Sequence, residues 1–352
     1  MKLKLPFPKK SAVLAQPVAT AVTRWDRSVS ERPGSHSLSG LRYEVYDEMR
    51  LDSMIQTAMT LKTLGVLRAS YRLESGGDTT VTHFVQRNLD QMQGSADSIL
   101  RQAMDAFIYG WSVQELTYRE HEGYLWLRST RALDPHYLGV VLDEFGRTTG
   151  LRLEIPGEAP RDLPLDRYVI FRNRDRYGLA KGQSDLDAAH RHWKSKQELL
   201  TKWELHLAKF ASPTVLGRFG TSVSVGEQGK LLDALRNITA ASALVVPDEV
   251  EVTALQSARE ASGYQEAIDF HNREIARCIL GQTLTTDEGK RVGSLALGKV
   301  HLQIFEMQLV ALRKALADEV MTEQVIRPLV ELNFGPQAPI PRLIFEESNW
   351  IA

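Results

Sequence analysis

The sequence has very little cysteine, since Cys278 is the only one among 352 residues. One thiol cannot form a disulfide within the chain, so the fold must depend on noncovalent packing. Neither sign of charge dominates, because the chain has 43 basic and 44 acidic residues. No overall positive field therefore attracts the chain to nucleic acid. No apolar run approaches the ~18 residues of a membrane span, and the opening MKLKLPFPKK lacks the apolar segment of a secretory signal. These absences predict a soluble, cytoplasmic chain.

Motifs for nucleotide binding and catalysis are also missing. The segment 279–301, ILGQTLTTDEGKRVGSLALGKVH, contains Gly289-Lys290. A phosphate-binding loop needs a glycine five positions earlier and Ser or Thr directly after the lysine, where this chain has Leu284 and Arg291. No G-x-S-x-G turn, which would present a nucleophilic serine, occurs. We therefore expect no catalytic residues and no bound cofactor.

The histidines do not form a recognisable metal site. His190 and His192 are two positions apart, which places them on different faces of a helix. His271 and His301 fit helix packing or solvation, and Cys278 fits a buried, inert thiol on the apolar side of a helix. We expect no metal.

The N-terminal residues 1–40 predict an arm. They mix Pro, Ser, Arg and Lys with little periodicity, and SERPGSHSLSG is turn-forming. Such an arm is either disordered or grips a neighbouring subunit.

Residues 41–175 predict an α+β body with antiparallel strands. Apolar residues recur three or four positions apart over Tyr43–Leu67 and Ala96–Tyr109, which is the spacing of helices, and Gly110 follows as a stop signal. Alternating segments predict strands. These are RASYRLES, a hairpin over 111–133 turning at Glu122-Gly123, a second over 137–156 turning at Phe145-Gly146, and RYVIFRN at 167–173.

Long helical patterns follow the body. Gln183–Phe210 predicts one helix of 28 residues, roughly 42 Å long at ~1.5 Å per residue. A small module then holds a strand in TVLGRFG, a helix over Gly226–Ala240 and strands in SALVVPDEVEVTAL. Tyr264–Gln282 predicts a second long helix. Leu295–Leu332 predicts a third, which Pro328 should end or kink.

The two helices that flank the small module have few apolar residues. Trp193 and Trp203 on the first, with Ile268 and Ile275 on the second, are the residues we expect to pack this stem. A helix so long and so polar can pack against its neighbours only along a narrow apolar stripe. Copies arranged in a ring would bury both flanks of each helix, so we expect a homo-oligomer.

The segment between the second and third long helices is polar and rich in glycine. It predicts a mobile loop over 283–295, with Ser294 as a plausible N-cap of the next helix. By itself this pattern also fits an ordinary solvent loop. The residues we single out are Thr285, Thr286, Asp287, Glu288, Gly289, Lys290 and Arg291.

Five segments, in this order, resemble the portal proteins of tailed bacteriophages, and most closely their Mu-like branch. The likeness covers roughly residues 41–340. The segments are MRLDSMIQTAMTLKTLGVL (49–67), AFIYGWSVQELTY (106–118), GLAKGQSDLDAAHRHWKSKQELLTKWELHLAKFASPTVLGRF (178–219), NREIARCILGQTLTTDEGKRVGSLALGKVH (272–301) and LVELNFG (329–335).

The resemblance implies an α+β portal fold with named parts. The parts are an N-terminal arm (1–40), a wing (41–180), a first stem helix (181–211), a clip (212–258), a second stem helix (259–282), a tunnel loop (283–295), a long wing helix (296–332) and a C-terminal wing tail (333–352). Only 17 residues follow the NFG phrase. We therefore expect the helical crown of longer portals to be minimal or absent.

The resemblance also implies a function. It implies a dodecameric ring at one capsid vertex, without enzymatic activity, through which double-stranded DNA is packaged and ejected. The implied partners are the terminase large subunit, the major capsid protein and neck or adaptor proteins, with no membrane. The implied location is the virion, and the host cytoplasm during assembly. Two alternatives remain open: a nucleic-acid-processing enzyme, and a non-portal ring-forming head–tail adaptor.

Overall fold

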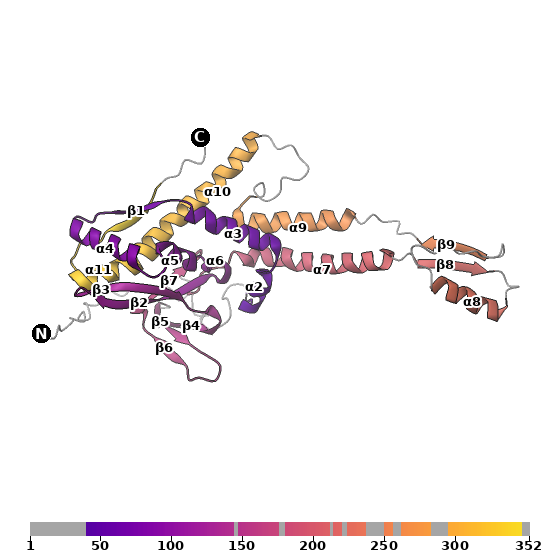
Figure 1. Ribbon diagram of the computed structural model, residues 1–352, viewed down its shortest axis with the longest axis horizontal. Helices are drawn as coiled ribbons and strands as arrows, with labels where there is room; N and C mark the ends of the chain where they lie inside the picture. Colours follow the sequence, from indigo (N-terminus) through magenta and orange to yellow (C-terminus); the bar gives the residue numbers. More distant parts are fainter. Residues whose placement is uncertain are drawn as a thin grey trace. The chain divides into compact units, whose positions relative to one another are not determined.

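The computed structural model describes residues 40–143, 147–175, 180–211, 214–219, 224–236, 250–255, 262–282 and 295–346 (Figure 1). The chain divides into two compact units. The first comprises the described parts of Met1–Leu51, Met59–Asp187 and Phe305–Ala352, and the second those of Asp52–Ala58 and Ala188–Ile304. The predicted arm up to residue 39, the predicted turn at Phe145-Gly146 and the predicted loop over 283–294 lie outside the described residues.

A three-stranded antiparallel sheet forms the centre of the first unit. Its order is β3-β2-β7, with β2 at Trp111–His121, β3 at Tyr124–Ala132 and β7 at Tyr168–Arg172. The turn between β2 and β3 has positive φ at both Glu122 (52°) and Gly123 (77°). Two such residues give the tight turn that suits the twist of a hairpin. The predicted hairpin and the predicted strand in RYVIFRN are confirmed.

Three helices pack on this sheet (Figure 1). They are α4 (Thr79–Gln91), α5 (Ala96–Ala103) and α6 (Ala106–Tyr109). The single helix predicted over Ala96–Tyr109 is wrong in one respect, because the chain leaves the helix at Met104 and Asp105. Gly110, at φ 85°, ends α6 as predicted. The sequence did not predict α4, although Asp78 accepts hydrogen bonds from the N–H groups of its first turn.

The helix predicted over Tyr43–Leu67 is two helices, α2 (Tyr43–Met49) and α3 (Ser53–Leu67). The Asp52 carboxylate accepts hydrogen bonds from the N–H groups of Met54 (2.9 Å) and Ile55 (3.3 Å), which starts a new helix. Leu51, placed by the sequence on the apolar stripe, is instead 85% exposed between them.

Two small antiparallel sheets complete the strands of the first unit. The sheet β4-β5-β6 contains Leu138–Leu142, Thr148–Leu153 and Arg161–Leu163. The sheet β1-β10 pairs Tyr71–Glu74 with Arg342–Phe345. The sequence predicted β1 but gave the C-terminal tail no strand. Its partner, β10, lies more than 260 residues away along the chain, so no local pattern links them.

The third long helix has three parts. They are α10 (Leu295–Ala315), the π-helical stretch η4 (Leu316–Ile326) and α11 (Arg327–Phe334). Of the apolar residues spaced three or four apart along it, Phe305, Leu309, Leu316 and Val320 are buried, whereas Leu312 is half-buried. Pro328 does not end the helix: it lies in the first turn of α11, directly after the widened stretch. In a first turn the missing N–H of proline needs no helical partner.

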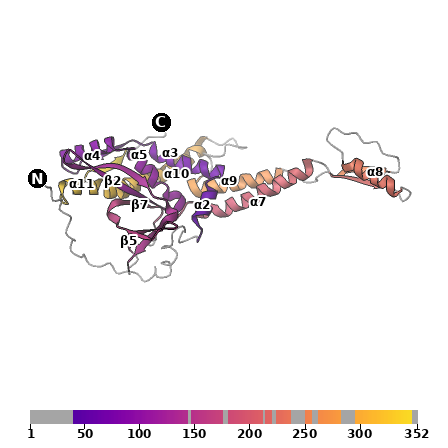
Figure 2. The ribbon, with the colours of Figure 1, turned by 60° about the horizontal axis from the view of Figure 1, so that its bottom comes forward.

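The second unit contains most of α7 (Leu186–Ala211) and α9 (Ser262–Leu280), which lie side by side in Figures 1 and 2. His192 contacts His271, and His206 contacts Tyr264, so the two helices are antiparallel. The chain between them forms β8 (Thr214–Phe219), α8 (Val225–Arg236) and β9 (Val250–Leu255), with β8 and β9 paired antiparallel. The long helices are confirmed with shifted ends: α7 begins at Leu186 rather than at the predicted Gln183, and α9 runs over Ser262–Leu280 rather than the predicted Tyr264–Gln282.

Candidate functional site

The predicted tunnel loop is bounded by two helix ends. α9 stops at Leu280 because Gly281 takes φ 70° and its N–H bonds back to the carbonyl of Arg277 (2.9 Å). Gln282, next along the chain, is buried, and α10 begins at Leu295. The seven residues from Thr285 to Arg291, and the predicted cap Ser294, lie outside the described residues. Their contact with DNA stays a prediction.

The four predicted stem residues differ in burial. Ile268 and Ile275 on α9 are buried within the chain. Trp193 and Trp203 on α7 are half-buried, and the Trp193 ring lies against His190, with ring centroids 6.0 Å apart. The isoleucines are thus packed in the single chain, whereas both indoles keep exposed surface that another chain could cover.

A buried ion pair holds the start of α3 to α7 in the second unit. The Nζ atom of Lys196 lies 2.7 Å from the Asp52 carboxylate, and the two side chains are 7% and 2% exposed. The same carboxylate caps α3 through Met54 and Ile55. Asp52 therefore caps the start of α3 and also joins α3 to α7.

A second buried ion pair lies in the first unit. Lys62 on α3 reaches the Asp185 carboxylate at 2.5 Å, and the Asp185 side chain is fully buried. Asn173 Nδ2 donates to the same carboxylate (3.0 Å), and Arg174 lies 3.1 Å from it. Buried charges of this kind are tolerated only with partners, and losing one partner is strongly destabilising. The segment directly before α7, which contains Asp185, is therefore held by charge as well as by packing.

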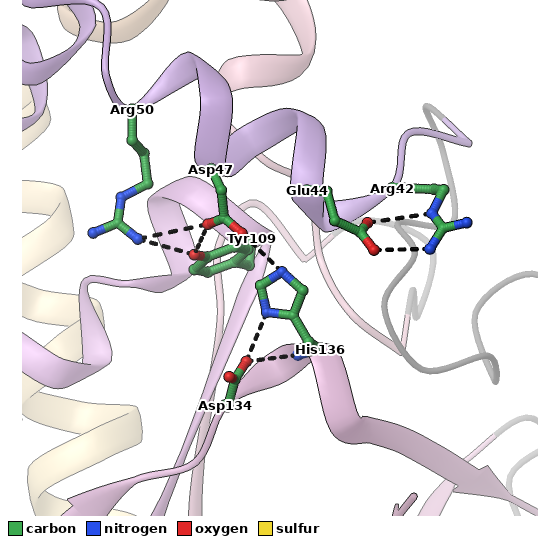
Figure 3. A network of polar contacts seen from close by, with 7 residues as sticks. All are labelled: Arg42, Glu44, Asp47, Arg50, Tyr109, Asp134 and His136. Atoms are coloured by element: carbon green, nitrogen blue, oxygen red, sulfur yellow. Dashed lines mark hydrogen bonds and ion pairs between the residues drawn. The ribbon is translucent and has the colours of Figure 1, made fainter. Parts of the chain in front are cut away.

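A polar cluster on the first unit links α2, α6 and the 3₁₀ turn η2 (Pro135–Tyr137) (Figure 3). His136 lies between two carboxylates, with Nε2 2.9 Å from Asp47 and Nδ1 2.7 Å from Asp134. The Tyr109 hydroxyl donates to Asp47 (2.5 Å) and accepts from Arg50 (2.9 Å). Burial raises the pKa of Tyr109, so the phenol remains a hydrogen-bond donor over the ordinary pH range.

These contacts join α2 to α6 and to η2 within the first unit. Both carboxylates beside His136 accept further hydrogen bonds, Asp47 from the Tyr109 hydroxyl and Asp134 from the backbone N–H of His136. At the edge of the cluster Arg42 is hydrogen-bonded to Glu44, which lowers the pKa of that carboxyl. The sequence did not predict the cluster, because its members come from segments about 90 residues apart and no local motif joins them.

The remaining predictions concern metals, thiols and membranes. Within the described residues no group of three or more His, Cys, Asp or Glu side chains could hold a metal ion. The thiol expected to be buried, Cys278, is half-buried. Across the same part of the chain, no helix combines the length and apolar character needed to cross a bilayer.

Comparison with known proteins gives one family. The model for "Portal protein of Mu bacteriophage" matches residues 43–349, which is most of the chain and includes all five segments that suggested this resemblance. A search of curated proteins finds no match in sequence.

Several solved structures share the fold. The structure described as "Neck of empty GTA particle computed with C6 symmetry" has a TM-score of 0.67 and 13% identity, and the match covers 91% of this chain and 87% of that one. "Neck of native GTA particle computed with C12 symmetry" gives 0.63 and 13%, covering 93% and 89%. "Virion of native gene transfer agent (GTA) particle" gives 0.63 and 13%, covering 90% and 86%. At this identity the likeness establishes the fold alone.

Proposed function

Because this chain belongs to the family of portal proteins of Mu bacteriophage, we propose that copies of it form a ring, of twelve in the assembled particle, at one vertex of a phage capsid. The ring is the conduit through which double-stranded DNA is packaged and later ejected. The observation that carries this proposal is the family match over residues 43–349. A neck described with twelvefold symmetry shares the fold and supports the number.

The antiparallel pair α7 and α9 supports a ring of copies. In an isolated chain each helix has one neighbour in the pair, and much of α7 stays in solvent, including Leu205 at 66% and Leu207 at 48% exposure. Around a closed ring, each pair lies between two others and buries both flanks. The half-buried Trp193 and Trp203 are the side chains that we assign to this contact.

The segment 283–295 lines the channel in this proposal. A channel must touch DNA without holding it, and contacts to phosphate carry no sequence information. Lys290 and Arg291 attract the phosphates, whereas Asp287 and Glu288 oppose them. The formal net charge of −1 suits a conduit that does not retain its cargo.

The partners follow from the same proposal. The small module over 212–258 is the docking surface for the terminase large subunit, which supplies ATP hydrolysis, and afterwards for neck or adaptor proteins. The wing, over 41–180, faces the major capsid protein. The protein is present in the virion, and in the host cytoplasm during assembly. The family is structural, and the portal itself has no enzymatic role.

Deletion of Lys290–Val292 tests the channel assignment. We expect the variant to form rings indistinguishable from those of the unaltered chain in negative-stain images, and to package or retain less DNA. Deleting three residues at the exposed turn Ile155–Glu158 of the first unit is the matched control and should leave packaging unchanged. Failure of ring formation would make the segment structural, and full packaging would remove it from the DNA path.

A further inference from the structure

Two histidines face each other across the antiparallel helices of the second unit. His192 on α7 and His271 on α9 bring their Nδ1 atoms within 3.2 Å, with ring centroids 5.4 Å apart. The other ring nitrogen of His192, Nε2, accepts a hydrogen bond from Nε of Arg191 at 3.3 Å. Three side chains therefore form a continuous chain of hydrogen bonds from α7 to α9.

The Arg191 contact fixes the proton positions. The guanidinium can only donate, so Nε2 of His192 carries no proton. A neutral imidazole has one ring proton, and on His192 it must be on Nδ1, from where it is donated to His271. Nδ1 of His271 is then an acceptor, and the proton of that ring is on Nε2.

The surroundings of His192 favour its neutral form. The Phe270 ring stands edge-on to His192 at 6.2 Å and to His271 at 5.2 Å. Burial lowers the pKa of His192, Arg191 and His271 lower it further, and Glu274 opposes the shift. Glu274 is itself paired with Arg277, so its charge is partly compensated.

We propose that Arg191, His192 and His271 form a pH-dependent latch between α7 and α9, closed while both imidazoles are neutral and opened by protonation. A proton added to Nε2 of His192 would face the Arg191 guanidinium. A proton added to Nδ1 of His271 would face the N–H of His192. Either event replaces a hydrogen bond by a repulsive contact between two donors. The latch lies within one chain, so it stands whether or not the proposed ring forms.

The sign of the pH effect follows from linkage. A histidine whose pKa is lower in the folded state binds fewer protons there than in the unfolded chain. The latch is therefore fully stabilising above the unfolded pKa of about 6.5, and its contribution falls as the pH drops below that value. The part of the chain affected first should be the helical segment around each histidine.

Two measurements on the full chain test the latch. The first is the ring ¹⁵N spectrum of histidine-labelled protein at pH 8, in which His192 should carry its proton on Nδ1. Finding it on Nε2 would overturn the proposal. The second is amide hydrogen exchange over 188–196 and 267–275, corrected for intrinsic rates, at pH 7.5 and pH 5. Exchange over these segments should be faster at pH 5 than at pH 7.5, because protonation replaces a hydrogen bond by a contact between two donors.

Three variants make the second measurement specific. His271→Leu removes the acceptor, so exchange should be fast at both pH values. His271→Asn keeps an acceptor oxygen that cannot be protonated, so the response to acid should be smaller than in the unaltered chain. His206→Gln, which removes another histidine that contacts α9, should retain the full response. Equal acid responses in the unaltered chain, His271→Leu and His271→Asn would contradict the latch.

Discussion

The carboxamide of Gln324 makes both backbone hydrogen bonds of Ile170. Its Oε1 accepts from the Ile170 N–H (2.8 Å) and its Nε2 donates to the Ile170 carbonyl (2.9 Å). Asn333 does the same for Leu125, at 2.7 Å and 2.8 Å. Ile170 lies on β7 and Leu125 on β3, the two edge strands of the central sheet. Side chains from η4 and α11 therefore satisfy, at these two positions, edges that would otherwise be open to another strand.

Replacing this carboxamide should destabilise the first unit. In Gln324→Met the side chain keeps its length but leaves the N–H and carbonyl of Ile170 without their partner. We expect a loss of about 1–3 kcal/mol in the free energy of unfolding, measured by urea denaturation. Gln86→Met, which removes an exposed hydrogen bond to Asp90 on α4, should change it by less than about 0.5 kcal/mol. A loss for Gln324→Met as small as that for Gln86→Met would mean that the contact with Ile170 contributes nothing to stability.

The buried pair Asp52–Lys196 gives a second prediction. Lys196→Met keeps the aliphatic stem but leaves the Asp52 carboxylate buried with only its helix-capping hydrogen bonds. We expect a loss of about 3 kcal/mol. Lys194→Met, at an exposed position on the same helix, is the matched control and should be close to neutral. A loss below ~1 kcal/mol for Lys196→Met would show that water reaches the carboxylate.

Close packing of α3 on α10 depends on a glycine. A Cβ at Gly65 would lie 2.7 Å from a methyl group of Leu309, which is 1% exposed. The Gly65 carbonyl also accepts from the Arg313 guanidinium (2.5 Å), which resists any shift of the helix.

Gly65→Ala should therefore cost about 1–3 kcal/mol, although alanine is the better helix former. Leu309→Ala alone should cost about 2–5 kcal/mol. In the double variant the added methyl occupies part of the space that Leu309 leaves, so the combined loss should be smaller than the sum. Additive losses, from thermal or urea unfolding, would mean that the two side chains do not meet.

A buried lysine predicts pH dependence at alkaline pH. Lys181 is fully buried, with Nζ 5.4 Å from the Trp111 ring and 5.6 Å from the Tyr43 ring. Burial lowers the pKa of Lys181 to about 7. Between this value and the unfolded pKa of about 10.4, the unfolded chain binds a proton that the folded chain does not. Stability should therefore rise with pH in this window, by up to about 1.4 kcal/mol per unit.

Lys181→Met should remove this slope and raise the free energy of unfolding at pH 7.5. Lys314→Met, at an exposed position, should leave the slope unchanged. Urea midpoints between pH 7 and pH 10 provide the measurement. A flat profile in the unaltered chain would show that Lys181 stays charged in the folded state.

Local patterns predicted most single elements. The hairpin at Glu122-Gly123, the stop at Gly110 and the long helices α7 and α9 were all visible in sequence, because turn chemistry and apolar spacing act within a few residues. The breaks at residue 52 and at residues 104–105 were missed. At the first, one carboxylate cap outweighs a continuous helical pattern.

Long-range relations could not be predicted in the same way. The β1–β10 pair, the carboxamide contacts to Ile170 and Leu125, and the cluster around His136 all join segments distant in sequence. Polar residues such as Gln324 look like ordinary surface positions until the fold brings a strand edge to them. The order of the long helices and the small module was visible in local patterns, whereas the roles given to these parts came from the family resemblance and stay predictions. The assignment of Thr285–Arg291 to the channel stays a prediction.

The central claim is that copies of this chain close into a ring around a channel. Negative-stain or cryo-electron images of the purified protein test it most directly, with Trp203→Asp as the companion variant because it would place an unpaired charge at a helix contact. We predict rings with an open centre wide enough for duplex DNA, and their loss or severe depletion in Trp203→Asp. Single subunits at high protein concentration, or closed particles without a channel, would contradict the account.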